Sequence, residues 1–218
     1  SVAGIIVETV QGDAGIRIPN PEWLRTIRDK CTQTGAHLVL DEIQCGFGRT
    51  GRPFAFEHFG VEPDHLCLGK ALGGGMPMGA LVSNKEHLQQ FAHSPSLGHI
   101  TTFGGHPVPC AASAAASALL QSTDWNRVEQ VGQTIEAAMR ECAYVREVRR
   151  IGLYIAVELK SSEAVNEVVQ TAMQRGVLVF YFLSTPQAFR IAPPLNINDV
   201  DLNEAIDTLI ACIVQAHA

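Results

Sequence analysis

The stretch HLVLDE, residues 37–42, is an apolar run that ends in two acidic residues. A short run of this kind is typical of a buried strand whose carboxyl end carries polar groups. Similar runs lie on either side of it, and we predict strands at AGIIVE (3–8), HLCLG (65–69) and GALVS (79–83). Between the first two runs, residues 20–35 have an Asn-Pro start, a helical apolar stripe and a closing glycine, which predict a helix. Strands that alternate with helices favour an α/β fold with a mostly parallel sheet covered on both faces.

The pattern changes after about Ser122, where amphipathic helices and shorter apolar runs follow one another. An Ala-rich helix is predicted at 106–121, before this change. After it, helices are predicted at 127–142, 163–176 and from about Asp199, and strands at 153–159, 177–182 and 189–193. The second part of the chain is therefore expected to be a smaller α/β domain with an open sheet.

Composition excludes several classes of function. The chain has 218 residues and a net charge of −6, and its scattered arginines do not form the basic cluster of a nucleic-acid-binding face. No apolar run approaches the roughly 20 residues that a membrane helix needs. The six cysteines have neither a CxxC pair nor metal-ligand spacing, which favours reduced thiols and a cytoplasmic location. The opening SVAGIIVETV has no initiator Met and no signal-type segment, which favours a processed or partial chain.

Two reactive side chains directly follow predicted strands. Asp41 comes directly after the apolar residues of the run at 37–42, and Lys70 follows the strand at 65–69. Ligands of open parallel sheets bind at the carboxyl ends of the strands. A lysine amine forms a Schiff base with an aldehyde, and a carboxylate keeps an aromatic nitrogen protonated, as a pyridoxal phosphate site requires. The glycines at 73–75 allow a close approach of the backbone. The pattern alone also fits a surface lysine and an Asp41 that forms a local turn.

Two further segments carry polar side chains in places that suit binding. TTFGGHP, residues 101–107, has two threonines before a helix that starts with proline, and a hydroxyl there can help to bind phosphate. RIAPP, residues 190–194, places Arg190 on a short apolar strand, where a guanidinium is expected to bind a carboxylate. Asp13, in the loop after the first strand, is the candidate partner. Taken alone, the threonines fit a helix cap and Arg190 fits a structural ion pair.

Together, five segments of the chain resemble the class III pyridoxal-phosphate-dependent aminotransferases of fold type I, and in particular the ornithine, acetylornithine and 4-aminobutyrate branch. The segments are VETVQGDAGI, LVLDEIQCGFGRTG, PDHLCLGKALGGGMPMGA, TTFGGHPVPCAAS and RIAPPL, and they follow one another between residues 7 and 195. The resemblance implies part of the cofactor-binding large domain over residues 1–122 and the small C-terminal α/β domain over residues 123–218. It covers only the C-terminal half of such an enzyme. The small-residue phosphate loop and the ring-stacking aromatic of the family have no counterpart in the chain.

The resemblance implies the residues that bind pyridoxal 5'-phosphate. Lys70 matches the lysine that carries the cofactor as a Schiff base and then moves a proton, and Asp41 matches the acid beside the pyridine nitrogen. Gln44 matches the residue that hydrogen-bonds the 3′ oxygen of the cofactor. Thr102 matches a threonine that contacts the phosphate across a subunit interface, which implies a homodimer with the site at that interface. No metal is implied.

The resemblance also implies the residues that bind the substrate. Arg190 matches the arginine that holds the substrate α-carboxylate, and Thr101 matches a small polar residue near the substrate. Asp13 falls where a glutamate commonly pairs with that arginine, and it is shorter by one methylene group. Gln44 favours the ornithine-like branch, because aminomutases and several ω-transaminases have an apolar residue at this position.

The implied function is transfer of an amino group from an ornithine-like or acetylornithine-like donor to a 2-oxo acid, in particular 2-oxoglutarate, in amino acid metabolism. Two alternatives stay open on the residues alone. One is another reaction at the same site, namely that of a decarboxylase, a racemase or an aminomutase. The other is an inactive fragment or an interaction module that lacks the N-terminal half of the site.

Overall fold

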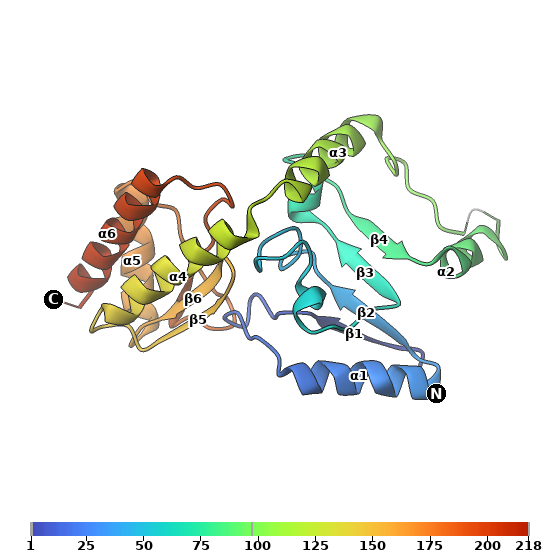
Figure 1. Ribbon diagram of the computed structural model, residues 1–218, viewed down its shortest axis with the longest axis horizontal. Coiled ribbons are helices and arrows are strands. Elements are labelled where there is room, and N and C mark those ends of the chain that lie inside the picture. The colour runs from blue at the N-terminus through green and yellow to red at the C-terminus, as the bar shows by residue number, and fades with distance from the viewer. Residues whose placement is uncertain (1, 97, 218) are drawn as a thin grey trace. The chain divides into compact units, whose positions relative to one another are not determined.

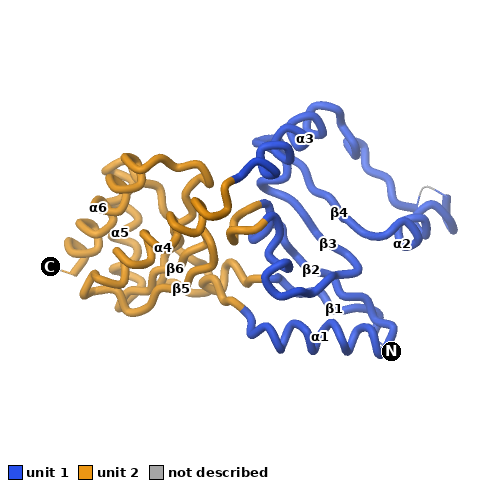
Figure 2. The backbone as a smooth tube through the Cα atoms, in the orientation of Figure 1, with its two compact units in different colours: residues 1–9, 19–47, 53–123 blue, residues 10–18, 48–52, 124–218 orange. Residues whose placement is uncertain are grey.

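The computed structural model describes residues 2–96 and 98–217, and the chain divides into two compact units. Unit 1 comprises residues 1–9, 19–47 and 53–123, and unit 2 comprises residues 10–18, 48–52 and 124–218 (Figure 2). Two short segments of the first half of the chain therefore belong to unit 2. The assignment of residues 1–122 and 123–218 to the large and small domains of an enzyme stays a prediction, and its outermost residues, 1 and 218, lie outside the described part.

Unit 1 is built on a four-stranded sheet in the order β1-β2-β3-β4 (Figure 1). Its strands are β1 (Gly4–Glu8), β2 (His37–Asp41), β3 (His65–Leu68) and β4 (Ala80–Ser83). The first three strands are parallel, and β4 is antiparallel to β3. A short 3₁₀ helix, η2 (Lys70–Gly73), and a glycine-rich turn join β3 to β4, and this connection is too short for the crossover that a parallel pair needs. The predicted strands and the mostly parallel sheet are confirmed.

The helices of unit 1 have clear start and stop signals. They are α1 (Pro21–Thr34), η1 (Ala55–His58), α2 (Lys85–Gln89), η3 (Gln90–Ala92) and α3 (Pro107–Gln121). Asn20 caps α1, because its side-chain oxygen accepts a hydrogen bond from the amide of Glu22 at 2.9 Å. Gly35 ends α1 in a left-handed conformation with φ of 71°. Leu24 and Cys31 on the inner face of α1 are buried, as the apolar stripe predicted.

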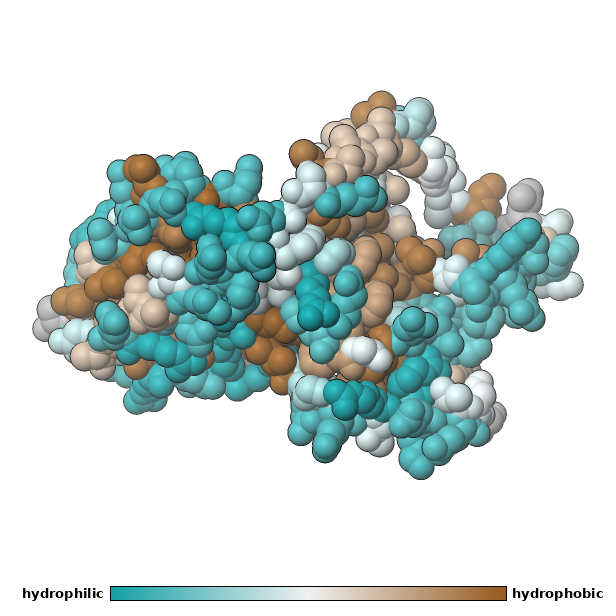
Figure 3. Space-filling view, viewed as in Figure 1, coloured by the Kyte–Doolittle hydropathy of each residue, from teal (hydrophilic) through white to brown (hydrophobic). Residues whose placement is uncertain are grey.

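Apolar side chains remain exposed on unit 1. Ile6 on β1 and Val82 on β4 are 73% and 49% exposed, and Leu119 on α3 is 72% exposed. Apolar colouring also gathers over α3 in the space-filling view (Figure 3). The prediction of a sheet covered on both faces is therefore wrong for the outer strands of the described chain. The physical reason is that α1 packs against β2, so the neighbouring strands receive less cover.

Unit 2 is a smaller α/β layer around its own apolar core. Its elements are α4 (Trp125–Glu141), β5 (Glu147–Ile151), β6 (Tyr154–Glu158), α5 (Ser162–Gln174), β7 (Phe180–Tyr181), β8 (Ala188–Ile191) and α6 (Asp199–Gln215). The antiparallel sheet has the order β5-β6-β8-β7, and α4 and α5 pack on it and contact α6 (Figure 1). Strand β5 was not predicted because its sequence EVRRI has polar residues at most positions. The strand predicted at 177–182 is shorter and contains only Phe180–Tyr181.

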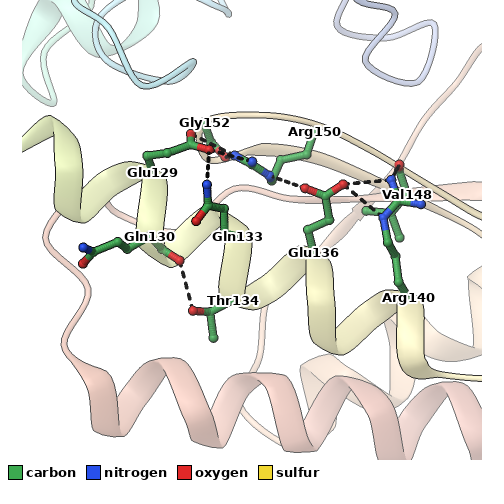
Figure 4. Close-up of polar contacts among 9 residues, drawn as sticks. All are labelled: Glu129, Gln130, Gln133, Thr134, Glu136, Arg140, Val148, Arg150 and Gly152. Atoms are coloured by element: carbon green, nitrogen blue, oxygen red, sulfur yellow. Dashed lines mark hydrogen bonds and ion pairs between the residues drawn. The ribbon is translucent and has the colours of Figure 1, made fainter.

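A charged network joins β5 to α4 in unit 2 (Figure 4). The Nη2 atom of Arg150 lies 2.8 Å from Oε1 of Glu129, and its Nε lies 2.6 Å from Oε2 of Glu136. Arg140 pairs with the same Glu136 at 2.8 Å. Nη1 of Arg150 also donates to the carbonyl of Gly152 at 3.2 Å. The hydrogen bond from Arg150 lowers the pKa of Glu129.

Candidate active site

Asp41 and Lys70 leave the same edge of the sheet in unit 1. Strands β2 and β3 are parallel neighbours, with Asp41 in register with Cys67. Asp41 is the last residue of β2, and Lys70 begins η2 just after β3. Oδ1 of Asp41 accepts a hydrogen bond from the amide of Ile43 at 2.9 Å. Asp41 therefore does form a local turn, and this turn uses one of its two carboxylate oxygens.

Lys70 has an unusual backbone for a lysine. Its φ is +47°, in the left-handed region that side chains other than glycine enter at a cost of about 1 kcal/mol. The residue before it, Gly69, packs so closely that a Cβ there would lie 3.2 Å from Cγ2 of Ile43. The loops after β2 and β3 are thus in contact. The Lys70 side chain is exposed, as for a surface lysine, but its strained and supported backbone is typical of a functional position.

Glu42 holds the loop beside Asp41 in place. Its side chain is buried, and Oε1 accepts hydrogen bonds from Thr9 Oγ1 at 2.9 Å and from the amide of Phe56 at 2.7 Å. Oε2 accepts from the amide of Ala55 at 2.7 Å. Burial raises the pKa of Glu42 even though these three donors act in the opposite direction. No role was predicted for Glu42, although an acidic residue directly after a buried strand is a signal that could have indicated one.

The raised pKa of Glu42 predicts a pH dependence of stability. Between the unfolded value of about 4.5 and the higher folded value, the folded chain binds more protons than the unfolded chain, so stability falls as pH rises through this window. Glu42→Gln removes this titration, and it also breaks hydrogen bonds at a cost of about 1–3 kcal/mol. We expect a less stable variant whose urea midpoint, followed by circular dichroism, varies less with pH above 4.5 than that of the wild type.

The exposed Glu22 on α1 provides the control for this measurement, and Glu22→Gln is expected to keep the wild-type pH slope. Equal slopes in the wild type and in Glu42→Gln would contradict the assignment of the raised pKa to Glu42.

Thr101 and Thr102 line a cavity of about 770 Å³ in unit 1. Residues 76–79, which follow η2 along the chain, also line it, together with residues 103–106 and 108–110. The described lining does not include Asp41 or Lys70. The cavity is therefore distinct from the strand ends that carry Asp41 and Lys70. Along the chain, the glycine-rich turn after Lys70 leads to the residues that line the cavity.

The start of α3 differs from one prediction. The sequence pattern allowed the threonines at 101 and 102 to cap this helix, but the cap is His106, whose Nδ1 accepts a hydrogen bond from the amide of Val108 at 3.2 Å. Gly105 has φ of +69°, and the turn that it forms separates the threonines from the helix start. The two threonine side chains are therefore not the cap of α3.

Gln44 lies half-buried in the turn that follows Asp41. The neighbouring Cys45 is buried, and its Sγ is 3.7 Å from the carbonyl of Asp41. Gln44 therefore lies three residues after Asp41, in the turn that follows β2.

Asp13 and Arg190 both belong to unit 2. Oδ2 of Asp13 accepts from Ser184 Oγ at 2.7 Å and Oδ1 accepts from the amide of Leu183 at 3.2 Å. These bonds, the Ser184 bond foremost, lower the pKa of Asp13, and the positive charge of Arg190 acts in the same direction. Within the described residues no ion pair involves Arg190, so the structural ion pair considered for it is wrong. Its guanidinium lies over the ring of Phe180 at 5.7 Å from the centroid.

A second arginine of unit 2, Arg49, was not among the predicted site residues. Its Nη1 donates to the carbonyls of Pro193 at 2.7 Å and Leu153 at 3.3 Å. Burial lowers the pKa of Arg49, and so does the positive charge of Arg190. A guanidinium held by carbonyl groups near another guanidinium favours binding of an anion. In the sequence Arg49 stands in RTG, at the end of a glycine-rich turn. Nothing in that local pattern indicates its contacts with Leu153 and Pro193.

The model of the family described as "Aminotransferase class-III" matches residues 1–213 of the chain. The chain belongs to this family. It is 38% identical over 213 residues to an acetylornithine aminotransferase from Methanocaldococcus jannaschii, which covers 95% of this chain and 51% of that relative. It is 39% identical over 219 aligned positions to a putrescine aminotransferase from Pectobacterium atrosepticum, with 95% and 47% covered.

A solved aminotransferase structure agrees with the fold. An ornithine aminotransferase from Toxoplasma gondii, described with partial occupancy of pyridoxal phosphate at its active site, superposes with a TM-score of 0.89. It is 31% identical, and the match covers 99% of this chain and 51% of that one. The family and the fold class inferred from the five sequence segments are confirmed.

The chain spans about half the length of the curated relatives that it matches, with 51% and 47% of their lengths covered. Among the described residues, no helix combines the length and the apolar character that crossing a membrane requires.

Proposed function

We propose that this class-III aminotransferase chain supplies the lysine-bearing half of a pyridoxal-phosphate-dependent transaminase. The observation that carries the proposal is that Asp41 and Lys70 follow adjacent parallel strands at the same edge of the sheet. Ligands of open α/β sheets bind at this edge. The family match and the named aminotransferase relatives support transamination over the other reactions of the same fold.

The residues present fit the chemistry of the cofactor. Pyridoxal phosphate has an aldehyde, a ring nitrogen and a phosphate, which call for an amine, an acid and hydroxyl donors. Lys70 supplies an exposed amine on a supported backbone, and Asp41 supplies a half-buried carboxylate with one oxygen tied to Ile43. Thr101 and Thr102 supply hydroxyl groups on the wall of the cavity. When bound, the cofactor supplies a ring that withdraws electrons from the substrate Cα.

Each side chain then has a defined role. The Lys70 amine holds the cofactor and moves the proton that leaves the substrate Cα, acting as a general base and acid. Asp41 keeps a proton on the ring nitrogen through a charge-assisted hydrogen bond. Gln44 hydrogen-bonds the 3′ oxygen of the ring, and Thr102 binds phosphate from across the interface of a homodimer.

The proposed substrate contacts lie on other side chains. Arg190 binds the α-carboxylate of the amino donor, and a planar guanidinium suits this group because it offers two parallel hydrogen bonds. Thr101 lies near the substrate. Asp13 is proposed to pair with Arg190 between the two half-reactions, which requires it to give up its hydrogen bonds to Ser184 and to the amide of Leu183.

The test is an amino-transfer assay. The preparation also contains the other half of a class-III aminotransferase, either joined to this chain or added as a separate polypeptide. Acetylornithine, ornithine, putrescine and 4-aminobutyrate are each incubated with 2-oxoglutarate and pyridoxal phosphate. We expect glutamate to form in proportion to the amine consumed for at least one donor, because transfer conserves the amino group.

Three results would contradict the proposal. One is amine consumption without glutamate, since release of carbon dioxide or a change of configuration would indicate a decarboxylase or a racemase. Another is rearrangement of the amine at constant nitrogen, which would indicate an aminomutase. The third is a folded preparation that turns over no donor and does not bind pyridoxal phosphate, which would indicate an inactive or purely interacting chain.

A further inference from the structure

Three histidines of unit 1 form a cluster at the end of the sheet opposite to Asp41 and Lys70. His37 is the first residue of β2, His65 is the first residue of β3, and His87 lies on α2. One ring nitrogen from each lies within 4.8 Å of the others. The ring centroids are 4.4 Å, 4.9 Å and 5.2 Å apart.

The rings of His37 and His65 share a hydrogen bond, which requires one of the two nitrogens to accept with its lone pair. Nδ1 of His37 and Nε2 of His65 are 2.6 Å apart, so one nitrogen carries the proton and the other accepts it. Nδ1 of His65 is buried and has no hydrogen-bond partner among the described residues. The pair therefore leaves a buried ring nitrogen of His65 that no described group satisfies. A buried polar atom of this kind calls for a partner such as a bound ion or a water molecule.

The third ring is oriented by a short chain of hydrogen bonds. The hydroxyl of Ser83 donates to the carbonyl of Asp64 at 2.8 Å, so its oxygen is left to accept from Nδ1 of His87 at a longer 3.4 Å. A proton on Nδ1 leaves the lone pair of Nε2 on His87 unprotonated. Metal-binding histidines commonly donate their second nitrogen to an oxygen in this way, which fixes the tautomer.

We propose that His37, His65 and His87 bind one divalent transition-metal ion of the zinc class, with a water molecule at the fourth position. Imidazole nitrogens are common ligands of zinc, and three of them with an open position make a familiar tetrahedral site. Zinc–nitrogen bonds of about 2.0–2.1 Å in this geometry require ligand nitrogens roughly 3.3 Å apart. The 2.6 Å contact between His37 and His65 must therefore open by a small side-chain rotation, and the metal takes the place of the shared proton.

A nearby carboxylate offsets the charge of the ion. Asp64 directly precedes His65, so its carboxylate is the acidic group next to the cluster along the chain. Its Oδ2 is held by the amide of Leu38 at 2.7 Å and by Arg28 at 2.8 Å. Asp64 is thus a fixed negative neighbour and not a fourth ligand.

The cluster is separate from the proposed catalytic residues. His37 precedes Asp41 by four positions on the same strand, and at about 3.3 Å per residue they lie roughly 13 Å apart along β2. The helix that carries His87 has no buried residue. A metal ion bound here would therefore connect a weakly anchored helix to the first residues of two central strands.

The test measures metal binding by the untagged full chain. Zn²⁺ is titrated by calorimetry and by competition with a chromogenic chelator, and Co²⁺ is used as a spectroscopic probe of the geometry. We expect one saturable site per chain, a visible Co²⁺ spectrum of tetrahedral intensity, and a rise in melting temperature with Zn²⁺. Mg²⁺ is expected to give none of these, because it prefers oxygen ligands.

Variants make the test specific. His87→Ala is expected to weaken Zn²⁺ binding about 100-fold or more, and Ser83→Ala about tenfold while all three ligands remain. The matched control is His93→Ala, an exposed histidine just beyond η3, which is expected to keep the wild-type affinity. His87 and Ser83 lie outside the core, and the far-UV circular dichroism of each variant verifies its fold.

Failure to bind Zn²⁺ saturably would overturn the proposal, as would a His87→Ala chain that binds as tightly as the wild type. An equal loss in His93→Ala would also overturn it, because the site would then be a nonspecific sum of surface histidines.

Discussion

Replacing Lys70 by alanine is expected to abolish covalent attachment of pyridoxal phosphate and to lower amino-transfer activity by at least about 1,000-fold. The amine at this position is proposed both to hold the cofactor and to move the substrate proton, and alanine can do neither. Two measurements check the result. Borohydride reduction followed by peptide mass spectrometry shows whether a pyridoxyl group is attached at residue 70, and the glutamate assay measures turnover.

Lys30→Ala is the control, because Lys30 is an exposed lysine on α1, where alanine is well tolerated in the helix. This variant is expected to keep both the label and the activity. A pyridoxyl label on another lysine in the wild-type protein, or undiminished turnover in Lys70→Ala, would contradict the assignment of Lys70.

Replacing Gly152 by alanine is expected to destabilise unit 2 by roughly 4 kcal/mol or more. Gly152 has φ of +56°, and a Cβ there would lie 2.2 Å from the carbonyl carbon of Thr50 and 2.4 Å from the amide nitrogen of Gly51. Helix α4 packs equally closely against Gly152, since a Cβ on Gly132 of that helix would lie 2.4 Å from the carbonyl oxygen of Gly152. These neighbours are backbone atoms and cannot rotate away. The fluorescence of Trp125, which packs on the core of unit 2, reports the urea midpoint in a Trp23→Phe background.

Gly176→Ala separates steric overlap from backbone strain. Gly176 is in the same unit and has φ of +86°, but no heavy atom beyond its chain neighbours lies within 4 Å of the position that a Cβ would take. Its replacement is therefore expected to cost only about 1–2 kcal/mol, from the left-handed backbone alone. Similar losses in Gly152→Ala and Gly176→Ala would show that close packing at Gly152 contributes little.

Local signals predicted most of the elements correctly. The Asn20 cap and the Gly35 stop bound α1, and the apolar run at 37–41 is β2. What the sequence did not predict is non-local. Residues 48–52 belong to unit 2 because the amide of Leu153 donates to the carbonyl of Arg49 at 3.1 Å, across more than a hundred residues of chain. No periodicity within 48–52 contains that information.

The candidate site shows the same limit. Asp41 and Lys70 were predicted to share an edge because strand order and direction determine where strand ends lie, and the parallel pairing of β2 with β3 is found. Glu42 was missed because its role depends on amides at Ala55 and Phe56, which follow a turn of irregular structure. The histidine cluster was missed because His37, His65 and His87 come together only through pairing of three separate segments.

The left-handed backbone of Lys70 has a consequence for laboratory evolution of this chain. Glycine adopts φ of +47° without the penalty of about 1 kcal/mol that a lysine incurs there. A screen that rewards heat resistance alone would thus enrich glycine at position 70 and discard the amine, whereas a screen for turnover would retain it. Thermal selection of this fold therefore has to be coupled to an activity readout.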